Sequence, residues 1–248
     1  MQQIGQEFME KTQHKHLPPS GQRKGLPAPP LELPHDPSQP AIPLPPPKQL
    51  GTEPVLLREL IEARRSIRRY ADGPISLEEL SYLLWCTQGV KEVIPHQATL
   101  RTVPSAGARH ALETYLLVRR VDELRAGLYR FLAIDHKLAE IATRAGIAEA
   151  ITDACLGQAF VMTGAVSFIW AAVPYRMAWR YSQRAYRYLH LDAGHVCQNL
   201  YLAAESIGCG VCAVAAFDDE ALAAALDLDG RQQFPIYLAA LGRKASDP

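Results

Sequence analysis

Apolar side chains recur at helical spacing in five stretches of the chain, which predicts helices over residues 54–63, 77–86, 147–156, 191–208 and 218–228. Ser76 directly precedes the second stretch, and Glu79 follows in the register of a capping box. The fourth stretch is the strongest helix prediction, because it is rich in alanine, contains no proline and ends at Gly208. Acidic residues in the first turn of the fifth stretch suit the helix dipole.

Other stretches are rich in β-branched and aromatic residues, which predicts strands over residues 113–121, 127–134, 165–173 and 234–242. The first two are joined by the polar residues 122–126, and Pro174 ends the third. Helices and strands mix without a regular alternation of strand and helix. The predicted fold class is therefore α+β.

The distribution of proline divides the chain into two parts. Twelve of the nineteen prolines lie between Pro18 and Pro47, so this segment cannot form many helix or ladder hydrogen bonds and is expected to be extended. It is either a flexible tail or linker, or an ordered arm laid over the same subunit or a partner. In the second case Leu31, Leu33, Ile42 and Leu44 would pack in a groove, for which a dimer surface is the expected place. We predict an arm over residues 1–50 and one domain over residues 51–248.

Composition restricts the function classes. The chain has 26 basic and 26 acidic residues and no formal net charge, which argues against nucleic-acid or membrane-surface binding. Its five cysteines are odd in number and unevenly spaced, so a disulfide framework is not expected and a reducing cytoplasm fits better. The first 16 residues are polar and lack the apolar region of a signal peptide, and no stretch is long enough to span a bilayer comfortably.

An arginine cluster is the strongest candidate for an anion site. Residues 64–70 read RRSIRRY and place four arginines around Ser66. Guanidinium groups and a hydroxyl are what a phosphate needs, although the solvated end of a helix would also explain the cluster. If the segment is extended, Arg64, Ser66 and Arg68 lie on one side. The sequence contains neither a G-x-G-x-x-G nor a Walker motif, so the candidates left for anion binding are this cluster and the C-terminal residues 241–244, which read LGRK.

Six motifs, taken in their order along the chain, favour a cofactor site over the solvated end of a helix. They are R-R-S-I-R-x-Y, L-L-W-x-x-Q-G, P-S-A-G, E-x-Y-L-L-V, G-H-x-x-Q-N-L-Y-L-A-A and L-G-R, and they span roughly Leu56 to Arg243. Together they resemble the FMN-dependent nitroreductase family, and within it the SagB/ThcOx-type branch related to azoline dehydrogenases. The resemblance implies a central, mainly antiparallel sheet flanked by helices, and an intertwined homodimer. The proline-rich arm lies outside the resemblance.

The resemblance also assigns cofactor roles. It places the FMN phosphate and ribityl chain on Arg64, Ser66 and Arg68, with Arg65 as a further contact. It also brings Arg243 to the phosphate, with Lys244 as a second candidate. It implies that backbone amides of Ala215 and Ala216 donate to the flavin ring. The turn over that ring would come from the partner subunit and consists of Pro104, Ser105, Ala106 and Gly107. Ala108 departs from the asparagine common in simple nitroreductases, so the pyrimidine edge of the flavin needs another partner.

The chemistry implied is hydride transfer, which the flavin carries and the protein positions. NAD(P)H is the expected reductant, with a nitroaromatic or quinone-like small molecule as acceptor, or the protein dehydrogenates a small product. No side chain is singled out as catalytic, and no metal is expected. Azoline-oxidising relatives use an adjacent Lys-Tyr pair, which this chain lacks, so that reaction is not favoured.

Two other functions stay open. The protein could be a flavin-binding partner or scaffold of a biosynthetic complex, with the arm as its docking element. It could also be a thiol-redox protein, because Cys209 and Cys212 have C-x-x-C spacing. That motif follows a predicted helix and enters an apolar loop, so buried cysteines are the preferred reading. His195 is expected to be a packed or interface histidine. The segment 174–188, dense in Arg, Tyr and Trp, could cover a substrate mouth, stack on planar rings or form a dimer surface.

Overall fold

A computed structural model describes residues 3–51, 53–95 and 97–245. Its centre is an antiparallel sheet of seven strands in the order β1-β6-β5-β4-β7-β9-β8. The strands are β1 (Ala41–Pro43), β4 (Leu112–Val118), β5 (Gly127–Leu132), β6 (Lys137–Ala142), β7 (Val166–Ala172), β8 (Cys209–Val214) and β9 (Phe234–Arg243). A separate hairpin pairs β2 (Val90–Ile94) with β3 (Ala98–Arg101). The predicted α+β class with a central antiparallel sheet is confirmed.

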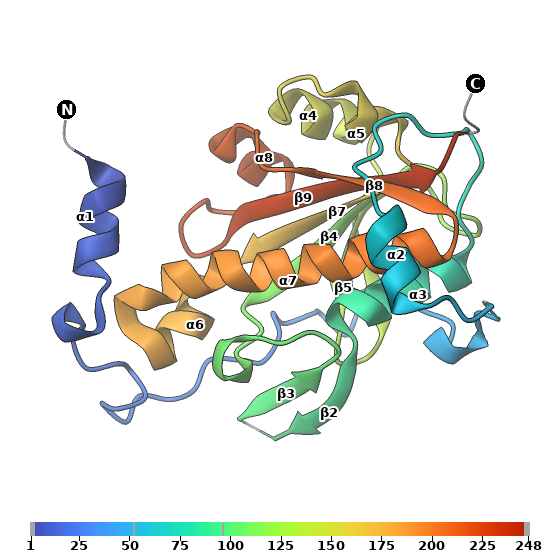
Figure 1. The fold of residues 1–248 in the computed structure, drawn as a ribbon. Helices are drawn as coiled ribbons and strands as arrows, with labels where there is room; N and C mark the ends of the chain where they lie inside the picture. Colours follow the sequence, from blue (N-terminus) through green and yellow to red (C-terminus); the bar gives the residue numbers. More distant parts are fainter. Residues whose placement is uncertain (1–2, 52, 96, 246–248) are drawn as a thin grey trace.

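Helices cover both faces of this sheet (Figure 1). One face carries α3 (Leu77–Gln88), α6 (Pro174–Tyr181) and the long α7 (Ala185–Ser206), and the other carries α4 (Ile147–Ala154), α5 (Ala159–Thr163) and α8 (Asp219–Ala225). Successive side chains of a strand point to opposite faces of the sheet, so β7 contributes to the core on each face. Phe168 and Trp170 belong to the first core, and Ile169 belongs to the second. Because every residue of β4 and β7 is buried, these strands carry little polar signal in the sequence.

The helix predictions hold, with shifted ends. Ser76 caps α3 and forms the expected capping box with Glu79. The long helix begins at Ala185 rather than at residue 191, and α2 (Leu57–Ala63) is shorter than predicted. Short helices complete the chain: α1 (Ile4–Lys11), η1 (His14–His16), η2 (Pro47–Gln49), η3 (Ala106–Ala108) and η4 (Ser182–Arg184). Within the described ranges, no helix is both long enough and apolar enough to cross a bilayer.

The prediction that C-x-x-C enters a loop is wrong. Residues Cys209–Val214 form β8, which pairs with β9 from Cys209↔Arg243 to Val214↔Leu238. The segment is short and contains Gly210, so its local sequence resembles a turn, but pairing with a long central strand overrides that preference. A side chain at Gly210 would lie 2.7 Å from Ile67, so the glycine lets residues 66–67 approach the strand.

The proline-rich arm is ordered against the rest of the same chain. Its β1 pairs with β6 at the edge of the sheet, Leu44 is buried, and Ile42 packs against the same core. The Glu32 carboxylate accepts hydrogen bonds from the backbone amides of Ala133 at 2.5 Å and Ile134 at 3.2 Å. The ordered arm is therefore confirmed, but its apolar residues pack on this chain. The division into an arm (1–50) and a domain (51–248) stays a prediction.

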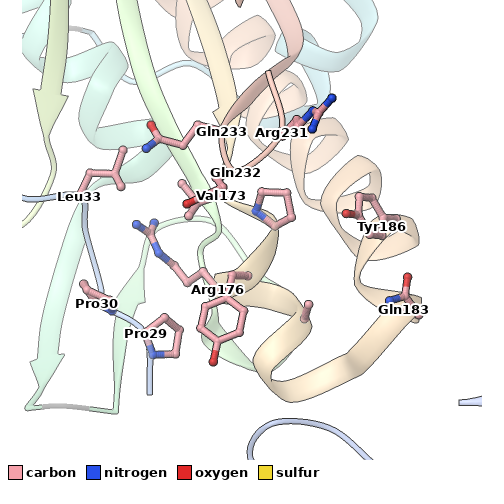
Figure 2. Close-up of a pocket in the computed structure, with 13 residues that line it drawn as sticks. Pro29, Pro30, Leu33, Val173, Arg176, Gln183, Tyr186, Arg231, Gln232 and Gln233 are labelled. Atoms are coloured by element: carbon pink, nitrogen blue, oxygen red, sulfur yellow. The ribbon is translucent and has the colours of Figure 1, made fainter. Parts of the chain in front are cut away.

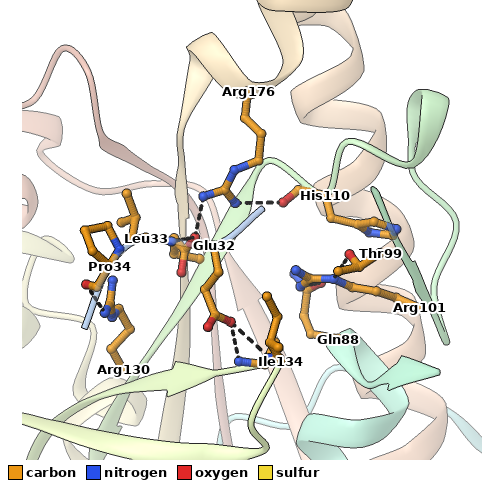
Figure 3. Close-up of polar contacts among 12 residues, drawn as sticks. Glu32, Leu33, Pro34, Gln88, Thr99, Arg101, His110, Arg130, Ile134 and Arg176 are labelled. Atoms are coloured by element: carbon orange, nitrogen blue, oxygen red, sulfur yellow. Dashed lines mark hydrogen bonds and ion pairs between the residues drawn. The ribbon is translucent and has the colours of Figure 1, made fainter. Parts of the chain in front are cut away.

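A buried charge cluster holds the middle of the arm (Figure 3). Arg176 of α6 and Glu113 of β4 form an ion pair at 2.7 Å, and each side chain is only 3% exposed. The same carboxylate accepts the backbone amide of Leu33 at 3.0 Å, and Arg130 donates to the carbonyl of Pro34 at 2.8 Å. Removing one member of such a pair leaves a buried charge and costs about 3–5 kcal/mol. The arm is therefore part of the folded core.

Candidate functional site

The arginine segment is extended, as one reading of the sequence required. Arg64 ends α2, and the following residues run beside β8, where the amide of Ile67 donates to the carbonyl of Val211 at 2.9 Å. Arg65, Arg68 and Arg69 are exposed, and Arg64 is half-buried. Among the residues that the structure describes, none of these four arginines forms an ion pair with a carboxylate. The segment therefore concentrates positive charge without neutralising it.

Tyr201 of α7 organises one end of this segment. Its hydroxyl accepts the amide of Ala213 in β8 at 2.9 Å and lies 3.1 Å from the Ser66 hydroxyl. The guanidinium carbon of Arg64 lies 5.4 Å from the centre of the Tyr201 ring, within the range of a cation–π contact. Arg64 and Ser66 thus meet on one side chain, as strand alternation predicts.

Arg68 and the predicted amide donors gather around α5. The guanidinium of Arg68 lies 5.9 Å from the ring centre of Phe160 in α5, and Gln158, just before α5, donates to the carbonyl of Ala216 at 2.9 Å. The ladder between β8 and β9 ends at Val214, and Ala215 and Ala216 follow it as exposed residues. The amides of these two residues therefore take no part in the pairing of β8 with β9.

Arg243 lies near the arginine segment but has protein acceptors for its guanidinium. It donates to the Glu79 carboxylate at 2.5 Å, to the Pro74 carbonyl at 3.1 Å and to the Ile207 carbonyl at 3.2 Å. Lys244 forms an ion pair with Glu205. These bonds, with a further contact from Arg243 to the Cys209 thiol, use four of the five guanidinium hydrogens, so Arg243 has one donor left for a ligand.

The turn Pro104–Gly107 is held against the other half of α7. Its Ala106 amide donates to the Asp192 carboxylate at 3.2 Å, and the Ser105 hydroxyl accepts the amide of His110 at 2.9 Å. Gly107 adopts φ +58°, and a side chain there would meet the Tyr181 hydroxyl at 2.4 Å. Asp192 is 4% exposed, and burial raises the pKa of its carboxyl. Asp192 therefore anchors the turn to α7.

The two groups of predicted residues do not meet within one chain. Asp192 supports the turn and Tyr201 supports the arginine segment, and these residues are nine positions apart on α7. At 1.5 Å per residue, the two supports lie about 13 Å apart along the helix. The turn and the arginine segment are therefore held at different parts of α7.

The cysteine pair is poorly suited to redox chemistry. Cys209 and Cys212 are buried, and both are free thiols. Burial raises the pKa of Cys209 to about 11 and also raises the pKa of Cys212, so both thiols stay protonated at neutral pH. Because the thiolate is the reactive form, the structure favours buried packing residues.

Two cavities flank α6. Figure 2 shows a cavity of about 540 Å³ between the arm and the start of α6, with Pro29, Pro30 and Leu33 on one wall and Tyr186 on another. A cavity of about 410 Å³ lies at the end of α6 and includes Arg180 and Tyr181, the two side chains that abut Gly107. The segment 174–188 therefore borders cavities on both sides of α6.

Comparison with known proteins decides the family. Residues 61–243 match the model of the nitroreductase family. The chain belongs to the nitroreductase family. The matched region contains the arginine segment, the turn and both supports on α7, whereas the arm precedes it. The family identifies the chain as an oxidoreductase enzyme.

Individual known proteins are also similar to this chain. The nitroreductase-type protein MJ1384 of Methanocaldococcus jannaschii is 34% identical over 192 residues, which cover 77% of this chain and 93% of that protein. A nitroreductase-type crystal structure from Ralstonia eutropha superposes with a TM-score of 0.69 at 26% identity, covering 90% of this chain and 96% of the other. The Escherichia coli microcin synthetase McbBCD complex, with truncated pro-MccB17 bound, shares the fold with a TM-score of 0.63 at 20% identity, over 97% of this chain and 87% of the other.

Sequence reasoning missed the two supports on α7. Tyr201 lies in the quoted motif Q-N-L-Y-L-A-A, and Asp192 lies just before it. A polar side chain on a predicted buried face is the signal that could have identified Asp192. Tyr201 carried no such signal, because its role depends on β8, which was not predicted.

Proposed function

We propose that this nitroreductase is an FMN-dependent enzyme that transfers hydride between NAD(P)H and an electron-poor small molecule, such as a nitroaromatic or a quinone. The observation that carries the proposal is that the arginine segment with Ser66 lies beside β8, the edge strand of the sheet. Positive charge, a hydroxyl and backbone amides lie there on three neighbouring elements. This combination suits a ligand with a phosphate and a planar hydrogen-bonding ring.

The residues present fit FMN. Arg64, Ser66 and Arg68 would hold the phosphate and ribityl chain, with Arg65 as a further contact. The amides of Ala215 and Ala216 would donate to the ring edge, and preorganised donors of this kind stabilise negative charge as it develops. When bound, FMN supplies the hydride chemistry. The chain supplies binding, orientation and electrostatics, with no side-chain acid or base required.

The proposal includes a two-fold homodimer, because the turn Pro104–Gly107 would close the partner's site. Two surfaces favour such an interface. Leu191, on the outer face of α7, is 59% exposed, and no atom lies within 4 Å of a side chain placed at Gly194. A second apolar surface surrounds α2, where Leu56 is 68% and Leu57 is 62% exposed. Apolar surface of this extent in one subunit is typical of an oligomer contact.

The absorption spectrum of the purified protein tests the cofactor. A band at about 450 nm that is bleached anaerobically by NADH or NADPH is expected for a flavin oxidoreductase. Light scattering of the same sample should give twice the mass of one chain. A colourless protein that does not take up added FMN would refute the flavin assignment, and a flavin-loaded monomer would refute the shared site.

A second function is favoured by one comparison. The structural likeness to the microcin synthetase complex covers nearly the whole chain, arm included, which fits a flavin-binding partner or scaffold of a biosynthetic complex and the SagB/ThcOx-type branch. Bound flavin without bleaching by either nucleotide would favour this alternative. The missing Lys-Tyr pair still argues against azoline oxidation by the relatives' mechanism.

A further inference from the structure

The cavity at the end of α6 is built partly by the N-terminal arm. Its volume is about 410 Å³, and its lining includes Arg23, Arg180, Tyr181 and two prolines of the arm. Seven of the ten lining residues lie at or before position 23, outside the part of the chain that matches the nitroreductase family model. The volume lies within the range of small-molecule sites.

Positive charge gathers here without a counter-ion. Arg23 and Arg180 line the cavity, and Arg109 donates to the carbonyl of Gly107, the residue against which the Arg180 side chain lies. Burial and the positive charge of Arg180 lower the pKa of Arg109. Within the part of the chain that the structure describes, none of these three arginines pairs with a carboxylate. Like charges held together in this way favour an anionic ligand.

The arm is anchored on both sides of Arg23. The Gln22 amide donates to the carbonyl of Trp179 at 2.8 Å, and the Trp179 indole donates to the carbonyl of Leu26 at 2.9 Å. Earlier in the arm, the Thr12 hydroxyl accepts from Arg187 at 2.7 Å. The arm therefore crosses the end of α6 in a fixed path, and Arg23 is presented at a defined place.

The cavity adjoins the turn that would cover the partner's flavin. Arg180 and Tyr181 belong to its lining, and both lie so close to Gly107 that a side chain there would meet them at 2.9 Å and 2.4 Å. Ser182, also in the lining, has φ 52° and ψ −140°, a sparsely populated conformation for a residue other than glycine. Backbone strain of this kind persists where the surrounding structure enforces it.

We infer that this cavity binds the phosphate-bearing adenosine end of the nicotinamide nucleotide, and that the arm thereby contributes to the choice of reductant. The inference rests on the proposed function. Guanidinium groups of Arg23 and Arg180 provide forks for phosphate oxygens, and Tyr181 with the prolines provides planar and apolar walls for the base. A 2′-phosphate adds further negative charge, so NADPH should bind more tightly than NADH.

Calorimetry on the flavin-loaded, full-length protein tests the inference with adenosine 2′,5′-bisphosphate as probe and adenosine 5′-monophosphate beside it. The bisphosphate should bind more tightly, and each of Arg23→Gln and Arg180→Gln should weaken it roughly ten- to a hundredfold. Arg231→Gln is the matched control, because that arginine lines the other cavity at α6. Arg180→Lys keeps the charge and should lose less affinity.

The outcomes separate this inference from the proposed function. No binding of the bisphosphate, equal affinity for the two probes, or an equal effect of all three glutamine variants would each overturn the inference. Flavin bleaching by NADH and NADPH is measured on the same samples. Failure of both nucleotides to bleach the flavin would refute the proposed reductant, while the calorimetry would still decide whether the cavity binds an adenosine phosphate.

Discussion

Tyr201→Phe is the sharpest test of how the chain builds its half-site. The substitution removes one oxygen, which accepts the amide of Ala213 and lies 3.1 Å from the Ser66 hydroxyl. The aromatic ring stays, so the contact with Arg64 at 5.4 Å is preserved. The change therefore isolates the hydroxyl from the cation–π contact.

Its effect on stability follows from the two hydrogen bonds of this hydroxyl, with Ala213 and with Ser66. A net loss of about 0.5–1.5 kcal/mol is expected for each bond, and the loss for the Ala213 bond rises toward about 3 kcal/mol if that amide finds no new acceptor. For a chain of this length 1 kcal/mol corresponds to a shift of about 2–4 °C in Tm. The affinity for FMN should also fall by several-fold, because the hydroxyl of Ser66 loses the neighbour that orients it.

The matched control is Tyr82→Phe. The Tyr82 hydroxyl lies 3.1 Å from Ser206, so this variant also loses one tyrosine hydrogen bond, but none that touches the arginine segment. Both variants should melt earlier than the parent in a thermal scan, and only Tyr201→Phe should weaken FMN in a fluorescence titration. Equal FMN affinity in the two variants would show that Tyr201 is a structural residue and not a support of the cofactor site.

Three further outcomes are expected. Arg68→Ala should weaken FMN about ten- to a hundredfold while Arg58→Ala, on the solvent side of α2, does not; unchanged occupancy in both would remove the phosphate assignment. Deleting residues 1–48 removes β1 and uncovers the core around Leu44, so Tm should fall, whereas an unchanged melt would show that the arm adds no stability. Burial and the charge of Glu113 raise the pKa of Glu32 from its ordinary value of 4.5. Above pH 4.5 the folded state therefore binds this proton more tightly than the unfolded state does, so the free energy of unfolding should fall as the pH rises. Glu32→Gln should flatten that part of the urea-unfolding profile, and an identical slope in parent and variant would contradict the assignment.

Local sequence predicted the elements that carry their own signals. The capping box of α3, the strands β4, β5, β7 and β9 and the core of α7 all follow from periodicity, caps or β-branched runs. The elements that were missed lack such signals. β8 is glycine-containing and is held by pairing with β9, and β1 is a proline-rich segment that pairs only because β6 offers an edge. Tertiary pairing decides these cases.

The residues of the candidate site also fall into two groups: those that local sequence identifies and those that only the folded chain brings together. Arg64, Ser66 and Arg68 could be proposed because four arginines in six residues are conspicuous in a chain without net charge. Their support could not, because Tyr201 reaches Ser66 across 135 positions and only the folded chain brings the two together. Arg243 shows the converse: its position near the segment was anticipated, but its bonds to Glu79 and to two carbonyls were not. Motifs identify which residues gather, and packing determines which of them are free to bind.

The arm makes contacts that lie outside the family motifs. The family model matches residues 61–243, so the arm precedes the matched region. The arm nevertheless supplies Glu32, which accepts the amides of Ala133 and Ile134, and Arg23, which lines a cavity beside the predicted turn. An arm that served stability alone would need only the first of these contacts, at the sheet edge. Its continuation across the end of α6, held by two hydrogen bonds to Trp179, places charge where a reductant would approach. For this reason substitution of Arg23, which leaves the contacts of β1 and Glu32 intact, separates a ligand-binding role of the arm from a purely structural one.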